Sequence, residues 1–78
     1  MRNKNVLLRD ILAKVYWVIK DFCNMDKEEL NKSYNKLSEC LEVSYKEADT
    51  YYYKNKVVEM QQLLSTEYLK YRELKKDE

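Results

Sequence analysis

Hydrophobic residues recur every three or four positions along most of the chain, which is the period of an amphipathic α-helix. In the first such stretch they fill an arc about 180° wide on a helical wheel and predict a helix over residues 5–23. Its apolar positions are Leu7, Leu8, Ile11, Leu12, Val15, Tyr16, Val18, Ile19, Phe22 and Cys23. Asn3 or Asn5 is suited to cap its start, and Asn24 can take the left-handed conformation that ends a helix where glycine is absent.

A second helix is predicted over residues 27–48. Asp26 and Glu29 have the spacing of a capping box. Met25 and Leu30 flank this box as a hydrophobic staple. The apolar seam of the helix consists of Leu30, Tyr34, Leu37, Leu41, Ser44 or Tyr45, and Ala48. Because the link to the first helix is so short, the two helices are expected to fold back as an antiparallel hairpin.

A third helix is predicted over residues 50–75, although no strong helix breaker precedes it. Its apolar seam consists of Tyr53, Val57, Met60, Leu64, Tyr68 or Glu67, Tyr71 and Leu74. This seam is offset by two residues from the preceding one, which is more than the drift of about 20° per heptad in a straight helix. The offset favours a turn, with Asp49 or Thr50 as the new N-cap.

Three helices of similar length predict an all-α protein: a single domain over residues 1–78, folded as a small antiparallel three-helix bundle. The alternative is a helical hairpin in which residues 27–75 form one long helix, which would have to dimerise to bury its apolar surface. A chain of 78 residues lies near the lower limit at which one core is sufficient, so oligomerisation is compatible with either arrangement.

The composition argues against catalysis. The chain has no glycine, proline or histidine, so it lacks the residue that builds phosphate-binding loops and the commonest general base and metal ligand. Cys23 and Cys40 lie on apolar arcs, where a thiol behaves as a small hydrophobic group. Most carboxylates lie near lysines on polar faces, where they stabilise helices. We therefore expect no enzyme activity, no cofactor and no metal site.

Charge and residue usage bear on location and source. Fifteen basic residues against fourteen acidic ones leave a net charge of +1, which provides no strong field for nucleic acid or an anionic membrane. Charged residues interrupt the most apolar stretch too often for a membrane span. With only two cysteines and no signal peptide in the sequence, the expected location is the cytoplasm. The abundance of lysine, asparagine and tyrosine is typical of AT-rich genes, including those of phages and plasmids.

A few apolar and aromatic residues lie off the predicted core seams. Trp17 falls on the charged side of the first helix, with only Val6 and Ala13 as apolar neighbours. Val58 and Leu69 are 11 residues apart and share one face of the third helix. A bundle with the first helix at its centre would bury these residues. If another helix does not cover them, they are candidates for partner binding, because tryptophan and tyrosine are enriched at protein interfaces.

The stretch from Tyr51 to Lys56 places three aromatic rings next to two lysines, and single-stranded nucleic-acid platforms combine the same residue types. Tyr52 fits the end of the second seam and Tyr53 the start of the third, so at least two of the three rings are expected to pack at the end of the bundle. Tyr51 then remains as a candidate contact residue.

These observations favour a non-enzymatic protein-binding module, an inhibitor, adaptor or regulator of another protein. The first alternative is a homo-oligomer in which Trp17 meets Val58 and Leu69 across a symmetric dimer. The second is a nucleic-acid-associated regulator that uses the Tyr51 to Lys56 stretch together with the C-terminal basic residues. A membrane partner is not expected, and a nucleic-acid partner is less favoured than a protein.

Overall fold

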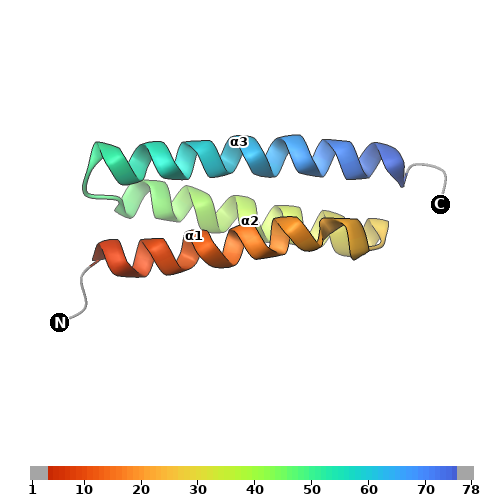
Figure 1. Cartoon of the computed structure of the whole chain (residues 1–78), viewed down its shortest axis with the longest axis horizontal. Helices are drawn as coiled ribbons and strands as arrows, with labels where there is room; N and C mark the ends of the chain where they lie inside the picture. Colours follow the sequence, from red (N-terminus) through yellow and green to blue (C-terminus); the bar gives the residue numbers. More distant parts are fainter. Residues whose placement is uncertain (1–3, 76–78) are drawn as a thin grey trace.

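The computed structural model describes the backbone of residues 4–75 and the side chains of residues 8–75. Within this range the chain forms three α-helices: α1 (Lys4–Lys20), α2 (Lys27–Glu47) and α3 (Tyr51–Leu74) (Figure 1). A short 3-10 turn, Asp21–Asn24, joins α1 to α2. The prediction of an all-α three-helix bundle is confirmed. The alternative of one helix over residues 27–75 is wrong, because α2 ends before Ala48 and α3 starts again at Tyr51.

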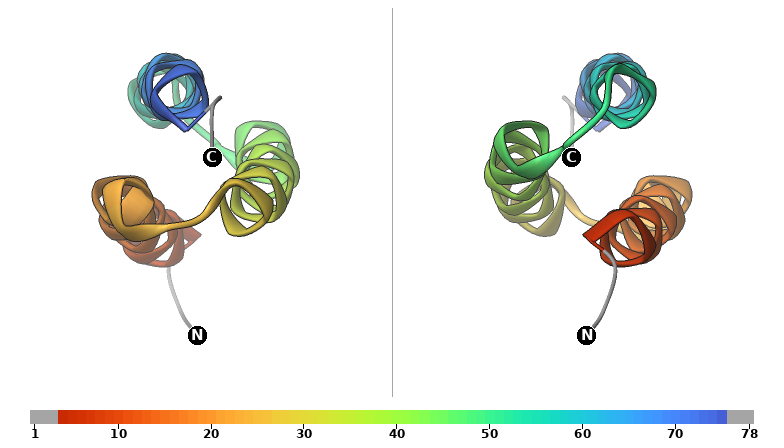
Figure 2. Two further views of the ribbon diagram at one scale, coloured as in Figure 1. Left: turned by 90° about the vertical axis from the view of Figure 1, so that its right-hand side faces the viewer. Right: turned by 90° about the vertical axis from the view of Figure 1, so that its left-hand side faces the viewer.

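The helices lie side by side, with α2 antiparallel to both α1 and α3 (Figure 1). Seen end-on, they occupy the corners of a triangle (Figure 2). Helix α3 is in contact with both other helices, and α1 and α2 touch each other less than either touches α3. A hollow lies on each side of α3, one shared with α1 and one with α2.

The core follows the predicted seams, except that Leu74 at the end of the third seam is 69% exposed. Its buried members are Val15, Ile19, Phe22, Leu30, Leu37, Leu41, Val57 and Leu64. At the end of the second seam Ser44, not Tyr45, faces inward, and its hydroxyl donates to the Cys40 carbonyl at 2.8 Å. This hydrogen bond satisfies the buried polar group. Tyr16 was expected in the core but is exposed, because its place on the wheel lies at the edge of the buried arc of α1.

The end of the first helix differs from the prediction. Helix α1 ends at Lys20, and the next four residues form the 3-10 turn. No described residue has a positive φ angle, so the expected left-handed Asn24 is wrong. The chain instead leaves the turn through an extended Met25, whose N–H donates to the Phe22 carbonyl at 3.1 Å. The tighter winding of the turn buries Phe22 and leaves the neighbouring Cys23 exposed.

Local side-chain caps start the other two helices. The Asp26 carboxylate accepts from the Glu29 N–H at 2.8 Å, as the capping box predicts. Thr50 caps α3 by accepting from the Tyr53 N–H at 3.3 Å. Of the two candidate caps for this helix, Thr50 is therefore the one used. The expected caps of α1 cannot be compared, since Asn3 and the side chain of Asn5 lie outside the described residues.

Asp26→Ala is expected to lower the free energy of unfolding by about 0.5–2 kcal/mol, because the Glu29 N–H loses its acceptor. Asp26→Asn is the matched control, since it keeps an oxygen at the same position and should cost much less. Urea denaturation followed by circular dichroism measures both variants. Equal stability of Asp26→Ala and the unmodified chain would contradict a role for this cap.

Candidate protein-binding surface

Trp17 projects from the last turn of α1 and has 69% of its surface exposed. Its indole contacts Tyr16 edge-to-face, with ring centroids 6.1 Å apart and planes at 77°. The described part of the chain therefore does not cover this side chain, although tryptophan is among the largest apolar residues. The expectation that Trp17 lies away from the core is confirmed.

A hollow of about 430 Å³ runs between α1 and α3 beside the indole. Its lining residues are Leu12, Ala13, Tyr16, Trp17, Lys56, Glu59, Met60 and Leu63. We call five of these lining residues, Ala13, Tyr16, Trp17, Met60 and Leu63, the Trp17 surface. Trp17 also borders a second hollow, which it shares with Val18 and with Met25 in the link before α2. The indole thus forms a ridge between two depressions.

Charged side chains lie at the margin of the Trp17 surface. Lys56 and Glu59 pair with each other across one turn of α3, at 3.9 Å. The Lys20 ammonium lies 5.2 Å from the centroid of the Tyr16 ring, within the range of a cation–π contact. An apolar centre with a charged margin is the usual anatomy of a protein–protein contact surface.

The structure separates the residues that the sequence suggested for partner binding. Ala13 and Trp17 lie together on the Trp17 surface. Leu69 is 56% exposed but lines a different hollow, between α2 and α3, and Val58, also exposed, shares its helix face. Tyr51 lies in the first turn of α3 and is 84% exposed. The side chain of Val6 lies outside the described residues.

Three residues of the Trp17 surface were not identified from the sequence: Tyr16, Met60 and Leu63. Each belongs to an apolar arc or borders a seam, and a helical wheel therefore assigns it to the core. A helical wheel cannot show that α1 and α3 leave a hollow between them, and the side chains that line this hollow stay partly exposed to solvent. Such a hollow depends on how two helices pack, so the sequence pattern of one helix does not predict it.

The tyrosine stretch at the start of α3 also differs from expectation. Tyr53 is half-buried, whereas Tyr52 is 62% exposed, so only one of the three rings packs on the bundle. The reason is that α2 ends before the second seam reaches Tyr52, whose ring instead meets that of Tyr53 edge-to-face at 5.1 Å. The neighbouring Lys54 donates to the Tyr45 carbonyl at 3.1 Å, which joins the two helix ends.

The two cysteines differ in exposure. Cys40 is half-buried on α2, in line with its apolar arc, but Cys23 is exposed and the expectation that it faces the core is wrong. Its thiol lies 3.7 Å from the Lys20 carbonyl oxygen, on the outside of the 3-10 turn.

We expect a thiol reagent to modify Cys23 rapidly in the folded protein and Cys40 more slowly, because access differs. The variants Cys23→Ser and Cys40→Ser separate the two reactions in a time course followed by mass spectrometry. Faster modification of Cys40 than of Cys23 would contradict the exposed position of Cys23 on the 3-10 turn.

The described residues form neither a metal site nor a membrane-spanning helix. No group of three or more cysteine, aspartate or glutamate side chains within residues 8–75 is placed to hold a metal ion. Among α1, α2 and α3, none combines the length and apolar character that crossing a membrane requires. Comparisons with protein-family models, with curated proteins and with solved structures found no match to this chain.

Proposed function

We propose that this chain is a non-enzymatic protein-binding module that uses the Trp17 surface as its contact surface. The observation that carries the proposal is the exposed indole of Trp17 at the edge of an apolar hollow. Tryptophan is strongly enriched among residues that dominate binding energy, because a large rigid ring buries much area at a small cost in rotamer entropy.

The shape of the surface indicates what a partner would present. Helices α1 and α3 run parallel (Figure 1), and successive turns of both, residues 12–17 of α1 and 56–63 of α3, line the hollow between them. It suits an apolar segment of another protein, with polar groups near Lys20 and near the Lys56–Glu59 pair. Inhibition or regulation of that protein in the cytoplasm, and a phage or plasmid gene as the source, are part of the same proposal and rest on composition.

Co-purification from an extract of the native host tests the proposal. We expect a stoichiometric protein to be recovered with the unmodified chain and to be lost with Trp17→Ala. Val43→Ala is the matched control, because Val43 is 55% exposed on α2 and lies outside the Trp17 surface; this variant should retain the partner. Recovery of no stoichiometric protein, or equal recovery with Trp17→Ala, would contradict the proposal.

Self-association is the second candidate, favoured by the same exposed indole. Because Leu69 lies on another side of α3, a symmetric dimer would place the Trp17 surface of one copy against that of the other. Light scattering over a range of concentrations separates the two candidates. A dimer that dissociates in Trp17→Ala would assign the surface to a second copy, whereas a concentration-independent monomer would leave it for an outside partner.

A further inference from the structure

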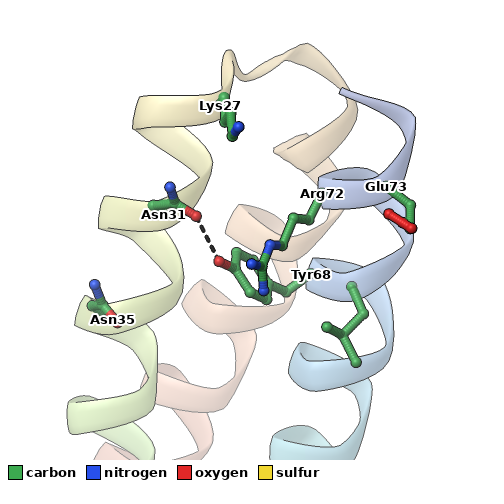
Figure 3. Close-up of a pocket in the computed structure, with 7 residues that line it drawn as sticks. Lys27, Asn31, Asn35, Tyr68, Arg72 and Glu73 are labelled. Carbon is green, nitrogen blue, oxygen red and sulfur yellow. Dashed lines mark hydrogen bonds between the residues drawn. The ribbon is translucent and has the colours of Figure 1, made fainter. Parts of the chain in front are cut away.

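A larger hollow, of about 730 Å³, lies between α2 and α3, where α2 begins and α3 ends (Figure 3). Its lining residues are Lys27, Asn31, Asn35, Tyr68, Leu69, Arg72 and Glu73. It shares no residue with the Trp17 surface, and most of its side chains are polar or charged. Its chemistry therefore differs from that of the apolar contact surface.

Helix α2 contributes a row of nitrogen donors. Lys27, Asn31 and Asn35 follow one another at intervals of four residues, so they lie on one face of the helix (Figure 3). Lys27 is also the first residue of α2, where the helix dipole favours negative charge. This face thus offers one ammonium and two amides to the hollow.

A hydrogen bond from α3 orients the middle amide. The Tyr68 hydroxyl donates to Asn31 Oδ1 at 2.5 Å, which leaves the Nδ2 hydrogens of Asn31 available to another acceptor (Figure 3). The Tyr68 ring is stacked on Tyr34, with centroids 4.0 Å apart and planes at 18°. The half-buried stack holds the Tyr68 hydroxyl in place, and the hydrogen bond from this hydroxyl orients the Asn31 amide.

Arg72 supplies the second positive charge. Its guanidinium lies 6.0 Å from the centroid of the Tyr68 ring, on the side of α3 that faces α2 (Figure 3). The ion pairs found among the described residues are Glu28–Lys32, Glu42–Lys46 and Lys56–Glu59, and they involve neither Arg72 nor Lys27.

One carboxylate lines the hollow. In Figure 3, Glu73 lies beyond Arg72 as seen from α2, at the outer margin. It should therefore weaken the attraction of the hollow for an anion without occupying the space between the donors.

We propose that this hollow binds an oxyanion, a carboxylate or a phosphate group. Arg72 and Lys27 provide the charge, and the amide N–H groups of Asn31 and Asn35 provide further donors. A guanidinium matches the two oxygens of either group in a bidentate contact, and the aromatic stack limits the loss of side-chain freedom on binding. The site does not depend on the Trp17 surface, so either proposal can fail without the other.

Nuclear magnetic resonance titration tests the proposal, with inorganic phosphate and glutarate as separate probes and sodium chloride at matched ionic strength as the reference. We expect saturable shifts of the Asn31 and Asn35 side-chain amides and of the Arg72 Nε–H with at least one probe. Saturation by glutarate alone identifies a carboxylate as the ligand group, and saturation by phosphate alone identifies a phosphate. Saturation by neither overturns the proposal.

Charge variants show whether the hollow is the site. Arg72→Gln should weaken the affinity at least about tenfold, the scale of one charge-assisted hydrogen bond, and Glu73→Gln should strengthen it. Lys36→Gln is the matched control, since it removes a positive charge from α2 outside the hollow. If Arg72→Gln disturbs the backbone spectrum, Lys27→Gln makes the same comparison. Equal losses in the hollow variants and in Lys36→Gln would overturn the proposal, because the anion would then respond only to net charge.

Discussion

Phe22→Ala is expected to lower the free energy of unfolding by about 3–5 kcal/mol. The Phe22 side chain is fully buried and belongs to the 3-10 turn that joins α1 to α2 and packs against α3. Removal of the Phe22 ring would leave a cavity where this turn connects α1 to α2 and contacts α3. A chain of 78 residues has a total stability of roughly 4–12 kcal/mol, so this single change would remove a large share of it.

Thermal and urea denaturation followed by circular dichroism would measure the loss. Leu69→Ala is the control, because Leu69 is exposed on α3 and its truncation should change the stability by less than about 0.5 kcal/mol. If Phe22→Ala were as stable as Leu69→Ala, the 3-10 turn would not hold its aromatic ring in the core.

Trp17→Ala should leave the fold intact and weaken partner binding by at least about 2 kcal/mol, which is the scale of an interface hot spot and about thirtyfold in Kd. The two effects separate because Trp17 is exposed in the free protein and would be buried only in a complex. The stability of the variant should stay within about 0.5 kcal/mol of the unmodified chain.

Calorimetric titration of the co-purified partner measures the affinity, and urea denaturation measures the stability. Trp17→Phe is a graded control, since it keeps an aromatic ring of smaller area and should lose only part of the affinity. A loss of about 3–5 kcal/mol in the stability of Trp17→Ala would show that the indole packs against its own chain, and the Trp17 surface would then lose its central residue.

The fold could be predicted from the sequence because its signals are local. The three- and four-residue spacing of apolar side chains depends only on helix geometry, and the Asp26 cap depends on residues three positions apart. The break before α3 followed from the offset between two seams. The prediction was wrong where the winding itself changed, at Asn24 and Cys23, since a 3-10 turn rotates each side chain further than an α-helix does.

The candidate sites could be predicted only in part. The side of α1 on which Trp17 lies follows from its own helix, because its polar neighbours place it away from the core, but its exposure depends on where the other helices pack. By contrast, the place of Met60 beside Trp17 depends on how α1 lies against α3. The contact between Tyr68 and Asn31 joins residues 37 positions apart and depends on the register of α2 against α3.

The sequence by itself therefore determined the three helices, their order and the side of α1 on which Trp17 lies, because each follows from periodicity and capping within one helix. Only the tertiary structure decided which exposed residues share a surface. Trp17 and Leu69 look equivalent on their own wheels, yet they lie in different hollows. The physical reason is that the rotation and register of neighbouring helices are fixed by contacts between side chains that are far apart in the sequence. A pattern within one helix does not contain that information.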